Sequence, residues 1–326
     1  MKKNVKTSAS QRKFLQATNI FFKSNLNLKK DESFLIMTDE YSWDLSRSLW
    51  QAAIEKYPQT YVMAFSAEKM QKIPPTKLFS FVLKSDVSLF VAREFLFLWK
   101  ELSFSKNLTT RWAWLIGIRP DQFTKLVDVD IQALKHNTQK LHDVLRLGKV
   151  ITIETDSEHA LSFKIDHSEC LADSGVVQNP GDIACIPGAR ALVKPVEEIA
   201  CGDLLINGSL SSVGMLQEPV RFMIRDGRLK KIYAKGDISD FRIGLRARNK
   251  NRRTLVRVGI GLNPHGKITG NLFADERANG VIHLAFGDET DFHSNILNPT
   301  LSIATIKKAS VKIDNKVILK RGKLVV

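Results

Sequence analysis

The stretch DIQALKHNTQKLHDVLRLGKVITIET, residues 130–155, contains the point at which the pattern of the chain changes. Most of it predicts an amphipathic helix, because apolar residues recur at helical spacing and share one face. These residues are Ile131, Leu134, Leu141 and Leu145. Asp130 can cap the start of this helix, and Gly148 can end it. The residues VITIET (150–155) follow at once and favour a β-strand, so the helix marks a boundary between two kinds of structure.

On the N-terminal side of this boundary, short apolar runs alternate with helical stretches. The strand candidates are SFLIMTD (33–39), TYVMAFSA (60–67), DVSLFVA (86–92) and RWAWLIGI (111–118). Between the first two, WDLSRSLWQAAIEKYP (43–58) repeats apolar residues at helical spacing and ends at a proline. Strands separated by helices are typical of βαβ units and a mostly parallel sheet. We therefore expect an α/β domain over residues 1–149.

On the C-terminal side, almost every segment is strand-like. The candidates are VITIET (150–155), ALSFKI (160–165), DLLING (203–208), VRFMIRDGRLKKIYA (220–234), TLVRVGIGL (254–262), VIHLAF (281–286), LSIATI (301–306) and SVKIDNKVILKRGKLV (310–325). The sequences RDGR (225–228) and IDNK (313–316) predict tight turns, because Asp-Gly and Asp-Asn tolerate positive φ. We expect a β-rich domain over residues 150–326, which makes the fold class α/β plus α+β.

The chain is strongly basic, since 49 Lys and Arg residues against 34 Asp and Glu residues give a net charge of +15. Such a charge attracts polyanions, so a basic scaffold that binds nucleic acid or an acidic partner is one hypothesis. The densest basic stretch, RIGLRARNKNRR (242–253), is typical of a solvated loop, and the rest of the excess is spread along the chain. Nucleic-acid binding is therefore the weakest of the functional hypotheses.

The cysteines and the apolar runs bear on the compartment. The three cysteines, Cys170, Cys185 and Cys201, form no CxxC pair, which argues against a structural zinc site and fits a reducing compartment. The basic N-terminal residues are not followed by the apolar run of a secretory signal. No stretch approaches the ~18 consecutive apolar residues of a membrane span. We expect a cytoplasmic protein with no membrane partner.

One histidine, His283, lies in the middle of the apolar run ANGVIHLAFGDET (278–290). The carboxylates near it in the sequence are Asp275, Glu276, Asp288 and Glu289, and His293 follows ten residues later. Histidine and carboxylates around a strand can form a transition-metal site. A lone histidine in a β-rich core can equally be a packed side chain. Both interpretations stay open on these residues.

The segment DHSECLADSGVVQNPGDIACIPGARALVKP (166–195) is rich in turn residues and contains one acid, Asp182, that we expect to be buried. Such a loop can aim a carboxylate inward, as binding loops do. A plain connector between two domains would have a similar composition. The residue types alone do not choose between these two interpretations.

Four segments carry a resemblance to a known family. They are LKKDESFLIMTDEYSWDLSRSLWQAA (28–53), NPGDIACIP (179–187), VGIGLNPHGKITGNLFADERANGVIHLAFGD (258–288) and SVKIDNKVILKRGKLV (310–325). The chain resembles the thermophilic metallo-aminopeptidase family of the aminopeptidase T and aminopeptidase S type, which also includes 2,5-dihydroxypyridine 5,6-dioxygenase. The segments are similar to its opening strand and helix, its Asn-Leu-Pro-Gly-Gly-Glu loop, its turn and His-Ile-Ala-Phe-Gly strand, and its closing hairpin.

The resemblance implies a site that this chain keeps only in part. In the family, two zinc or cobalt ions are held by two glutamates, two histidines, an aspartate and a tyrosine, and they activate a water against a peptide carbonyl. By resemblance, the loop glutamate falls on Asp182, the second glutamate on Arg257 and the strand histidine on His283. His293 is the nearest ligand-type residue to the tyrosine. The family's C-terminal His-x-Asp pair is absent from residues 294–326.

These departures favour loss of the two-metal chemistry. A two-metal site needs several anionic ligands, and Arg257 is always charged and repels a cation. We expect Arg257 to supply the local positive charge and to pair with Asp182, with His283 as a relic of the ligand set. The cofactor is then none, or one divalent metal (zinc or cobalt) held by Asp182 and His283, with His293, in a site open to solvent.

Two further functional hypotheses follow from this site. The first is a divergent aminopeptidase-family protein that binds a peptide or small molecule in the inherited cleft. The second is an active metal-dependent aminopeptidase, or another metalloenzyme, with a rearranged site; the dioxygenase activity ranks below the peptidase activity. Because members of the family are typically dimers, the resemblance also implies a homodimer.

Overall fold

The computed structural model describes residues 8–70, 82–93, 109–246, 250–287 and 301–325. The chain divides into two compact units, of which the first comprises Met1–Ile131 and Gly175–Pro187 and the second comprises Gln132–Ser174 and Gly188–Val326. The predicted boundary after residue 149 differs from this division in two places. The helix before that boundary belongs almost entirely to the second unit, and residues 175–187 return to the first unit.

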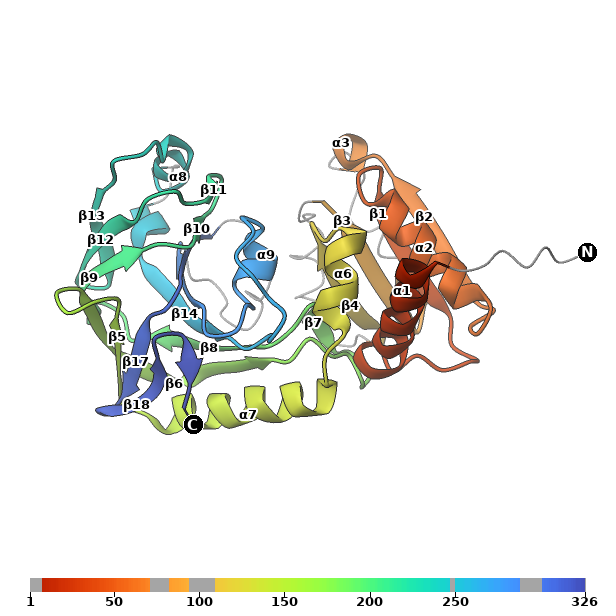
Figure 1. Cartoon of the computed structure of the whole chain (residues 1–326), viewed down its shortest axis with the longest axis horizontal. Helices are drawn as coiled ribbons and strands as arrows, with labels where there is room; N and C mark the ends of the chain where they lie inside the picture. Colours follow the sequence, from red (N-terminus) through yellow and green to blue (C-terminus); the bar gives the residue numbers. More distant parts are fainter. Residues whose placement is uncertain (1–7, 71–81, 94–108, 247–249, 288–300, 326) are drawn as a thin grey trace, which may run out of the picture. The chain divides into compact units, whose positions relative to one another are not determined.

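The first unit is built on a five-stranded parallel sheet in the order β2-β1-β3-β4-β7 (Figure 1). Its strands are β1 (Phe34–Asp39), β2 (Thr60–Phe65), β3 (Val87–Ala92), β4 (Arg111–Ile116) and β7 (Ile183–Cys185). Its helices are α1 (Ala9–Ile20), the π-helical segment η1 (Phe21–Asn25), α2 (Trp43–Ile54), α3 (Ala67–Met70) and α6 (Pro120–Val127). All residues of β1, β3 and β4 are buried, as expected for apolar strands in the middle of a parallel sheet.

Aromatic side chains form much of the core of this unit. Phe90 on β3 stacks on Trp114 of β4 with ring centroids 4.4 Å apart, and on Trp112 at 5.7 Å. Phe90 and Trp114 are direct partners in the register of the two strands, so they lie on the same face of the sheet. The four predicted strands of this unit are confirmed.

The second unit contains a 14-stranded sheet whose main path runs β11-β10-β16-β15-β14-β8-β6-β5-β17-β18-β19, with β9, β12 and β13 off this path (Figure 1). Its strands up to β13 are β5 (Val150–Glu154), β6 (Ala160–Asp173), β8 (Arg190–Pro195), β9 (Cys201–Ile206), β10 (Ser209–Leu210), β11 (Gly214–Met215), β12 (Val220–Arg225) and β13 (Arg228–Tyr233). The others are β14 (Leu255–Gly261), β15 (Ile282–Phe286), β16 (Ser302–Ile306), β17 (Ser310–Ile313), β18 (Lys316–Lys320) and β19 (Lys323–Leu324). The short helices are α8 (Ser239–Gly244), the 3-10 helix η2 (Lys250–Arg253) and α9 (Leu272–Asp275).

Both predicted turns of this unit adopt positive φ. Asp226 and Gly227 have φ of 51° and 65°, and Asp314 and Asn315 have φ of 48° and 70°. The turns join β12 to β13 and β17 to β18 as the sequence predicts. The predicted fold class, a mostly parallel α/β domain and a β-rich domain, is confirmed.

The segment 166–195 is mostly strand, not loop. Strand β6 continues to Asp173, β8 begins at Arg190, and β7 between them pairs in parallel with β4 of the first unit's sheet. Strand β6 pairs with β5 through residues 160–164 and with β8 from Ile165 onward, with a bulge between Asp166 and Cys170 in the pairing with β8. The many turn residues of this segment predict a loop, so these strands were not expected from the sequence.

Helix α7 (Ile131–Leu147) is the predicted helix, and its predicted apolar residues are buried. Leu145 of α7 shares a small apolar gap with Val193, Val258 and Ile282, which belong to β8, β14 and β15. One face of the sheet is therefore apolar and lies toward α7. Successive residues of a strand alternate between faces, so the neighbours of these valines and isoleucine point to the opposite face.

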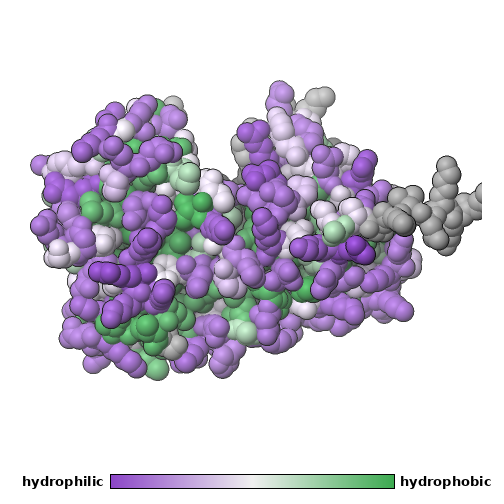
Figure 2. Space-filling view, viewed as in Figure 1, coloured by the Kyte–Doolittle hydropathy of each residue, from purple (hydrophilic) through white to green (hydrophobic). Residues whose placement is uncertain are grey.

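The surface is largely hydrophilic. Figure 2 shows hydrophilic residues over most of the viewed face of each unit, with a hydrophobic patch in the region where Figure 1 places β18 and one end of α7. No helix within the described ranges combines the length and the apolarity needed to cross a membrane.

Candidate functional site

His283 lies on β15, between β14 and β16, and is fully buried. Its direct partners in the register are Gly259 on β14 and Thr305 on β16. A Cβ atom on Gly259 would lie 2.2 Å from Cε1 and 2.3 Å from Nε2 of His283. The imidazole therefore lies directly across the backbone of β14, in space that only a glycine leaves open.

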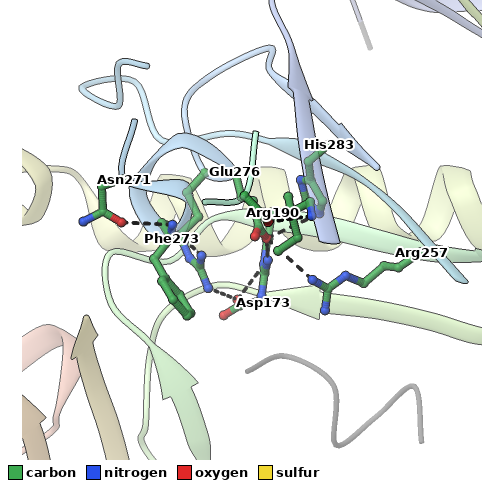
Figure 3. A network of polar contacts seen from close by, with 10 residues as sticks. Asp173, Arg190, Arg257, Asn271, Phe273, Glu276 and His283 are labelled. Carbon is green, nitrogen blue, oxygen red and sulfur yellow. Dashed lines mark hydrogen bonds and ion pairs between the residues drawn. The ribbon is translucent and has the colours of Figure 1, made fainter. Parts of the chain in front are cut away.

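A group of buried charged side chains surrounds this histidine, on the side of the sheet opposite α7 (Figure 3). We call it the buried arginine cluster, and it consists of Asp173, Arg190, Arg257, Glu276, Arg277 and His283. Four of its members come from the adjacent strands β6, β8, β14 and β15, and the other two directly follow the short helix α9. The cluster is thus assembled by strand pairing and closed by one connecting segment.

Two arginines hold one aspartate in the cluster. Arg190 donates from Nε to Oδ2 of Asp173 over 3.0 Å, and Arg277 donates from Nη2 to the same oxygen over 3.1 Å. Arg277 also donates from Nη1 to the carbonyl oxygen of Phe273 over 2.6 Å. Because Asp173 and Arg190 are directly paired at the ends of β6 and β8, their side chains lie on one face.

The carboxylate of Glu276 is the meeting point of the other members. Arg190 forms an ion pair with it through Nη1. Nη2 of Arg257 lies 3.8 Å and Nε2 of His283 lies 3.6 Å from the same oxygen, Oε2. Both separations exceed the length of a hydrogen bond. Arg257 and His283 thus approach one carboxylate oxygen from neighbouring strands (Figure 3).

Burial and charge keep His283 neutral. Loss of solvation lowers its pKa well below the ordinary value of 6.5, and the positive charges of Arg190, Arg257 and Arg277 lower the pKa further. Among the described residues, neither ring nitrogen has a hydrogen-bond partner. The neutral ring therefore offers one donor and one acceptor inside the cluster.

The residues of the cluster do not fit a bound metal ion. In the part of the chain that the structure describes, no three His, Cys, Asp or Glu side chains form a group that could hold one. The nearest approach is the pair His283 and Glu276, and the three guanidinium groups of the cluster lie around it. Fixed positive charges beside a carboxylate compete with a cation for it.

Asp182 has a structural role in a turn of the first unit. Its Oδ2 accepts hydrogen bonds from the backbone N–H groups of Gln178 and Asn179, each over 2.8 Å. A carboxylate beside Arg257 is that of Glu276; Asp182 belongs to the other compact unit, so its expected pairing with Arg257 stays a prediction. His283 is buried, and the ligand set that joins it to Asp182 and His293 stays a prediction. His293 lies outside the described residues.

Sequence reasoning missed Asp173, Arg190 and Arg277 as members of the site. The only local signal is that each charged residue adjoins an apolar or turn segment, which is also true of many surface residues. Glu276 was one of the four carboxylates that the sequence places near His283. Its neighbour Asp275 makes other contacts. Asp275 accepts hydrogen bonds from Ser209 and from the backbone of residues 269 and 270, and burial raises its pKa.

Comparisons with known proteins identify related folds. A family model described as 2,5-dihydroxypyridine 5,6-dioxygenase (NicX) matches residues 115–326. The structure of 2,5-dihydroxypyridine dioxygenase from Pseudomonas putida is similar with a TM-score of 0.78 at 13% sequence identity, over 98% of each chain. Wild-type AmpT from Thermus thermophilus is similar with a TM-score of 0.68 at 14% identity, over 98% of this chain and 100% of the other. No curated protein matches the sequence.

Proposed function

Because the chain belongs to the 2,5-dihydroxypyridine 5,6-dioxygenase family, we propose that it is a divergent member that binds a peptide or small molecule without metal chemistry. The observation that carries this proposal is the buried arginine cluster. Among the described residues, three guanidinium groups lie around His283 and Glu276, the pair that comes closest to a metal-ligand set in the cluster. The similarity to AmpT supports a shared fold. The family match supports the proposal that the site is inherited from the family.

The charges of the cluster support a metal-free site. Taking a divalent cation out of water into a buried position requires compensating negative ligands, and several kcal/mol per ion are at stake. Glu276 is already paired with Arg190, so its charge is not available to a cation at full strength. Neutral His283 adds no negative charge. In the family's usual chemistry a metal ion would activate water or oxygen, and among the described residues the anionic donors around His283 are too few to hold one.

The test is the metal content of the purified protein, measured by mass spectrometry before and after soaking with zinc, cobalt or iron(II). We expect well below one metal ion per chain in every case. The matched control is the His283→Ala variant, which should give the same low value. Near-stoichiometric metal in the native protein that disappears in His283→Ala would overturn the proposal.

A second candidate function is metal-dependent catalysis at a rearranged site, because the family model that matches is that of a dioxygenase. A dioxygenase would consume oxygen and 2,5-dihydroxypyridine when iron(II) is supplied. A metal-dependent aminopeptidase-like hydrolase would instead release the amino-terminal residue of a peptide when zinc or cobalt is supplied. Turnover in either assay, lost in His283→Ala, would replace the first proposal with this one.

We also propose, by extension from the family, that the protein is a cytoplasmic homodimer. The free state of Cys170, Cys185 and Cys201 is consistent with a reducing compartment. Light scattering of the purified chain measures its mass in solution and decides between monomer and dimer.

A further inference from the structure

We propose that the second unit carries a binding surface for the phosphate backbone of a double-stranded nucleic acid. The surface lies where two turns near the C-terminal end of the chain meet, and we call it the basic turn patch. It consists of Lys307, Lys308, Lys320, Arg321 and Lys323. The proposal goes beyond the function proposed above and does not depend on it, because no residue of the patch belongs to the buried arginine cluster.

The two turns of the patch touch each other through their backbones. The first turn joins β16 to β17, and the second joins β18 to β19 (Figure 1). The N–H of Gly322 in the second turn donates to the carbonyl oxygen of Ala309 in the first turn over 2.8 Å. A Cβ atom on Gly322 would lie 3.3 Å from the Cα of Lys308. The fold therefore joins cations from two separate stretches of the sequence into one group.

Both turns are tied to neighbouring segments. The side chain of Asn207 accepts a hydrogen bond from the N–H of Lys307 over 2.7 Å and donates one to its carbonyl oxygen over 3.2 Å. The N–H of Arg321 donates to Oγ of Ser310 over 3.1 Å. The backbone that carries the cations is thus held in place before any partner arrives, which lowers the entropic cost of binding.

The charges of the patch are exposed and uncompensated by other described residues. All five residues are exposed, and none of them forms an ion pair within the described ranges. Lys320 and Lys323 are direct partners in the register of β18 and β19, and like charges directly opposite each other destabilise a sheet. An anionic partner would remove this repulsion.

Backbone geometry gives a second sign of function. Lys308 and Arg321 have φ of 58° and 47°, a conformation that a residue with a long side chain rarely adopts. Such strain is typical of positions that serve in binding. The fold therefore keeps cations where neither electrostatics nor backbone geometry favours them.

The surroundings favour a phosphate backbone over other anionic partners. Among the described residues, Val325 is the only exposed large apolar residue within two positions of the patch in the sequence. A protein interface has an apolar core, and an interfacial membrane anchor has an apolar face. Residues 301–326 contain no Phe, Tyr or Trp, so neither turn supplies the aromatic platform on which single strands stack. The partner that cations alone can bind is a duplex, with its dense rows of phosphates.

Binding of this kind is independent of base sequence and strongly dependent on salt. Each neutralised phosphate releases counterions, so the logarithm of the binding constant falls by about 0.9 per contact for a tenfold rise in salt. Five contacts give a slope of about −4.5. We expect a dissociation constant on the order of 10⁻⁶ M at low salt, at the tight end of non-specific binding.

The test measures the fluorescence anisotropy of a short labelled duplex DNA, titrated with the full-length protein at several salt concentrations. The patch variant carries the substitutions Lys307→Gln, Lys308→Asn, Lys320→Gln, Arg321→Asn and Lys323→Gln. Asparagine is used at the two positions with positive φ because it tolerates that conformation. We expect at least about a tenfold loss of affinity at low salt and a slope close to zero. The melting temperature should not fall, because the substitutions remove a like-charge pair.

A matched control removes the same number of charges elsewhere, from the same net charge of +15. It carries Lys13→Gln, Lys23→Gln, Lys84→Gln, Lys125→Gln and Lys140→Gln, all at exposed and scattered positions. This variant should bind the duplex almost as the native protein does. An equal loss in both variants would assign the binding to net charge instead of the patch and overturn the proposal.

The other outcomes are also decisive. No binding by the native protein, or binding that salt does not weaken, overturns the proposal. Tighter binding to phosphatidylserine vesicles or to polyglutamate than to a duplex, lost in the patch variant, overturns the choice of partner. Duplex RNA of the same sequence separates the two sources of such a backbone: binding of either duplex supports the proposal, and the tighter one identifies the source.

Single variants keep the test open if the patch variant does not fold, as judged by circular dichroism. Lys320→Gln and Lys323→Gln each remove one phosphate contact, so each should make the salt slope shallower by about one. Two folded single variants with the native slope would overturn the proposal.

Discussion

His283 shows how the meaning of one residue depends on its neighbours. In the sequence it is a histidine in an apolar strand, which suits a metal ligand and a packed side chain equally well. In the structure it is a neutral imidazole within an arginine-rich cluster. A carboxylate close to it, that of Glu276, is also approached by Arg190 and Arg257.

The lowered pKa of His283 predicts a pH dependence of stability. Below about pH 6.5 the histidine of the unfolded chain takes up a proton, while the buried ring of the folded protein does not. The free energy of unfolding therefore falls as the pH falls from about 6.5 toward the lower folded-state pKa, by at most about 1.4 kcal/mol per pH unit for this one group. Above pH 6.5 the group contributes no pH dependence.

Denaturant unfolding at several pH values checks this. His283→Gln should have a shallower loss of stability between pH 6.5 and 5 than the native protein. His136→Gln, at an exposed position on α7, is the matched control and should follow the native curve. Parallel curves for the native protein and His283→Gln would contradict the neutral assignment.

At the scale of elements, strand β14 is shaped by its glycines. Every residue of β14 is buried, and Gly259 lies where the ring of His283 and the side chain of Leu192 both press against the strand. A larger residue at position 259 would push the histidine away from Glu276. The sequence shows a strand with two glycines, and only the pairing with β15 shows why one of them is needed.

We predict that Gly259→Ala destabilises the fold by about 1–3 kcal/mol, the usual effect of adding atoms to a packed core. The added Cβ would lie 2.2 Å from Cε1 of His283 and 2.5 Å from Cδ2 of Leu192, so at least one side chain must move. Gly236→Ala is the control, because a Cβ there meets no atom within 4 Å. Equal melting temperatures for the two variants would contradict this account of β14.

Combining Gly259→Ala with His283→Ala should relieve part of the loss, since the two short contacts with the imidazole ring are then gone while the contact with Leu192 remains. A double-mutant cycle measures this coupling directly. An additive result would mean that the histidine ring is not what the methyl group displaces.

In the whole molecule, the sheets of the two units are covered by different kinds of side chain. The parallel sheet of the first unit buries both faces under apolar and aromatic side chains. The sheet of the second unit places an apolar layer toward α7 and the buried arginine cluster on its other face. Asp173 and Glu276 of that cluster pair with its arginines, and the proposed metal-free function rests on this pairing.

We therefore expect the melting temperature of the native protein to be the same with EDTA, with added zinc and without either. A ligand that binds only the folded state stabilises it by mass action, and about 2.7 kcal/mol is gained at a concentration 100-fold above the dissociation constant. Differential scanning calorimetry would detect such a gain. A rise in melting temperature with zinc that EDTA reverses would reveal a bound metal.

The fold class and most of the elements that define it follow from the sequence. Local apolar spacing decides whether a segment is a strand or a helix, so β1 to β5, α7 and the hairpins at residues 226–227 and 314–315 follow from their own residues. The composition also determined the strongly basic character of the chain. The resemblance singled out His283 and Arg257, and the structure places both in the buried arginine cluster.

Which charged side chains pair with one another depends on the tertiary structure. Strand pairing places Asp173 of β6 beside Arg190 of β8, and the segment that follows α9 brings Glu276 to them from a distant part of the sequence. Periodicity reports which side of an element a residue occupies, but it carries no information on which other element lies opposite. The partner of Arg257 could therefore be proposed from the sequence but not identified, and the environment of His283 depends on contacts that form only when β6, β8, β14 and β15 assemble.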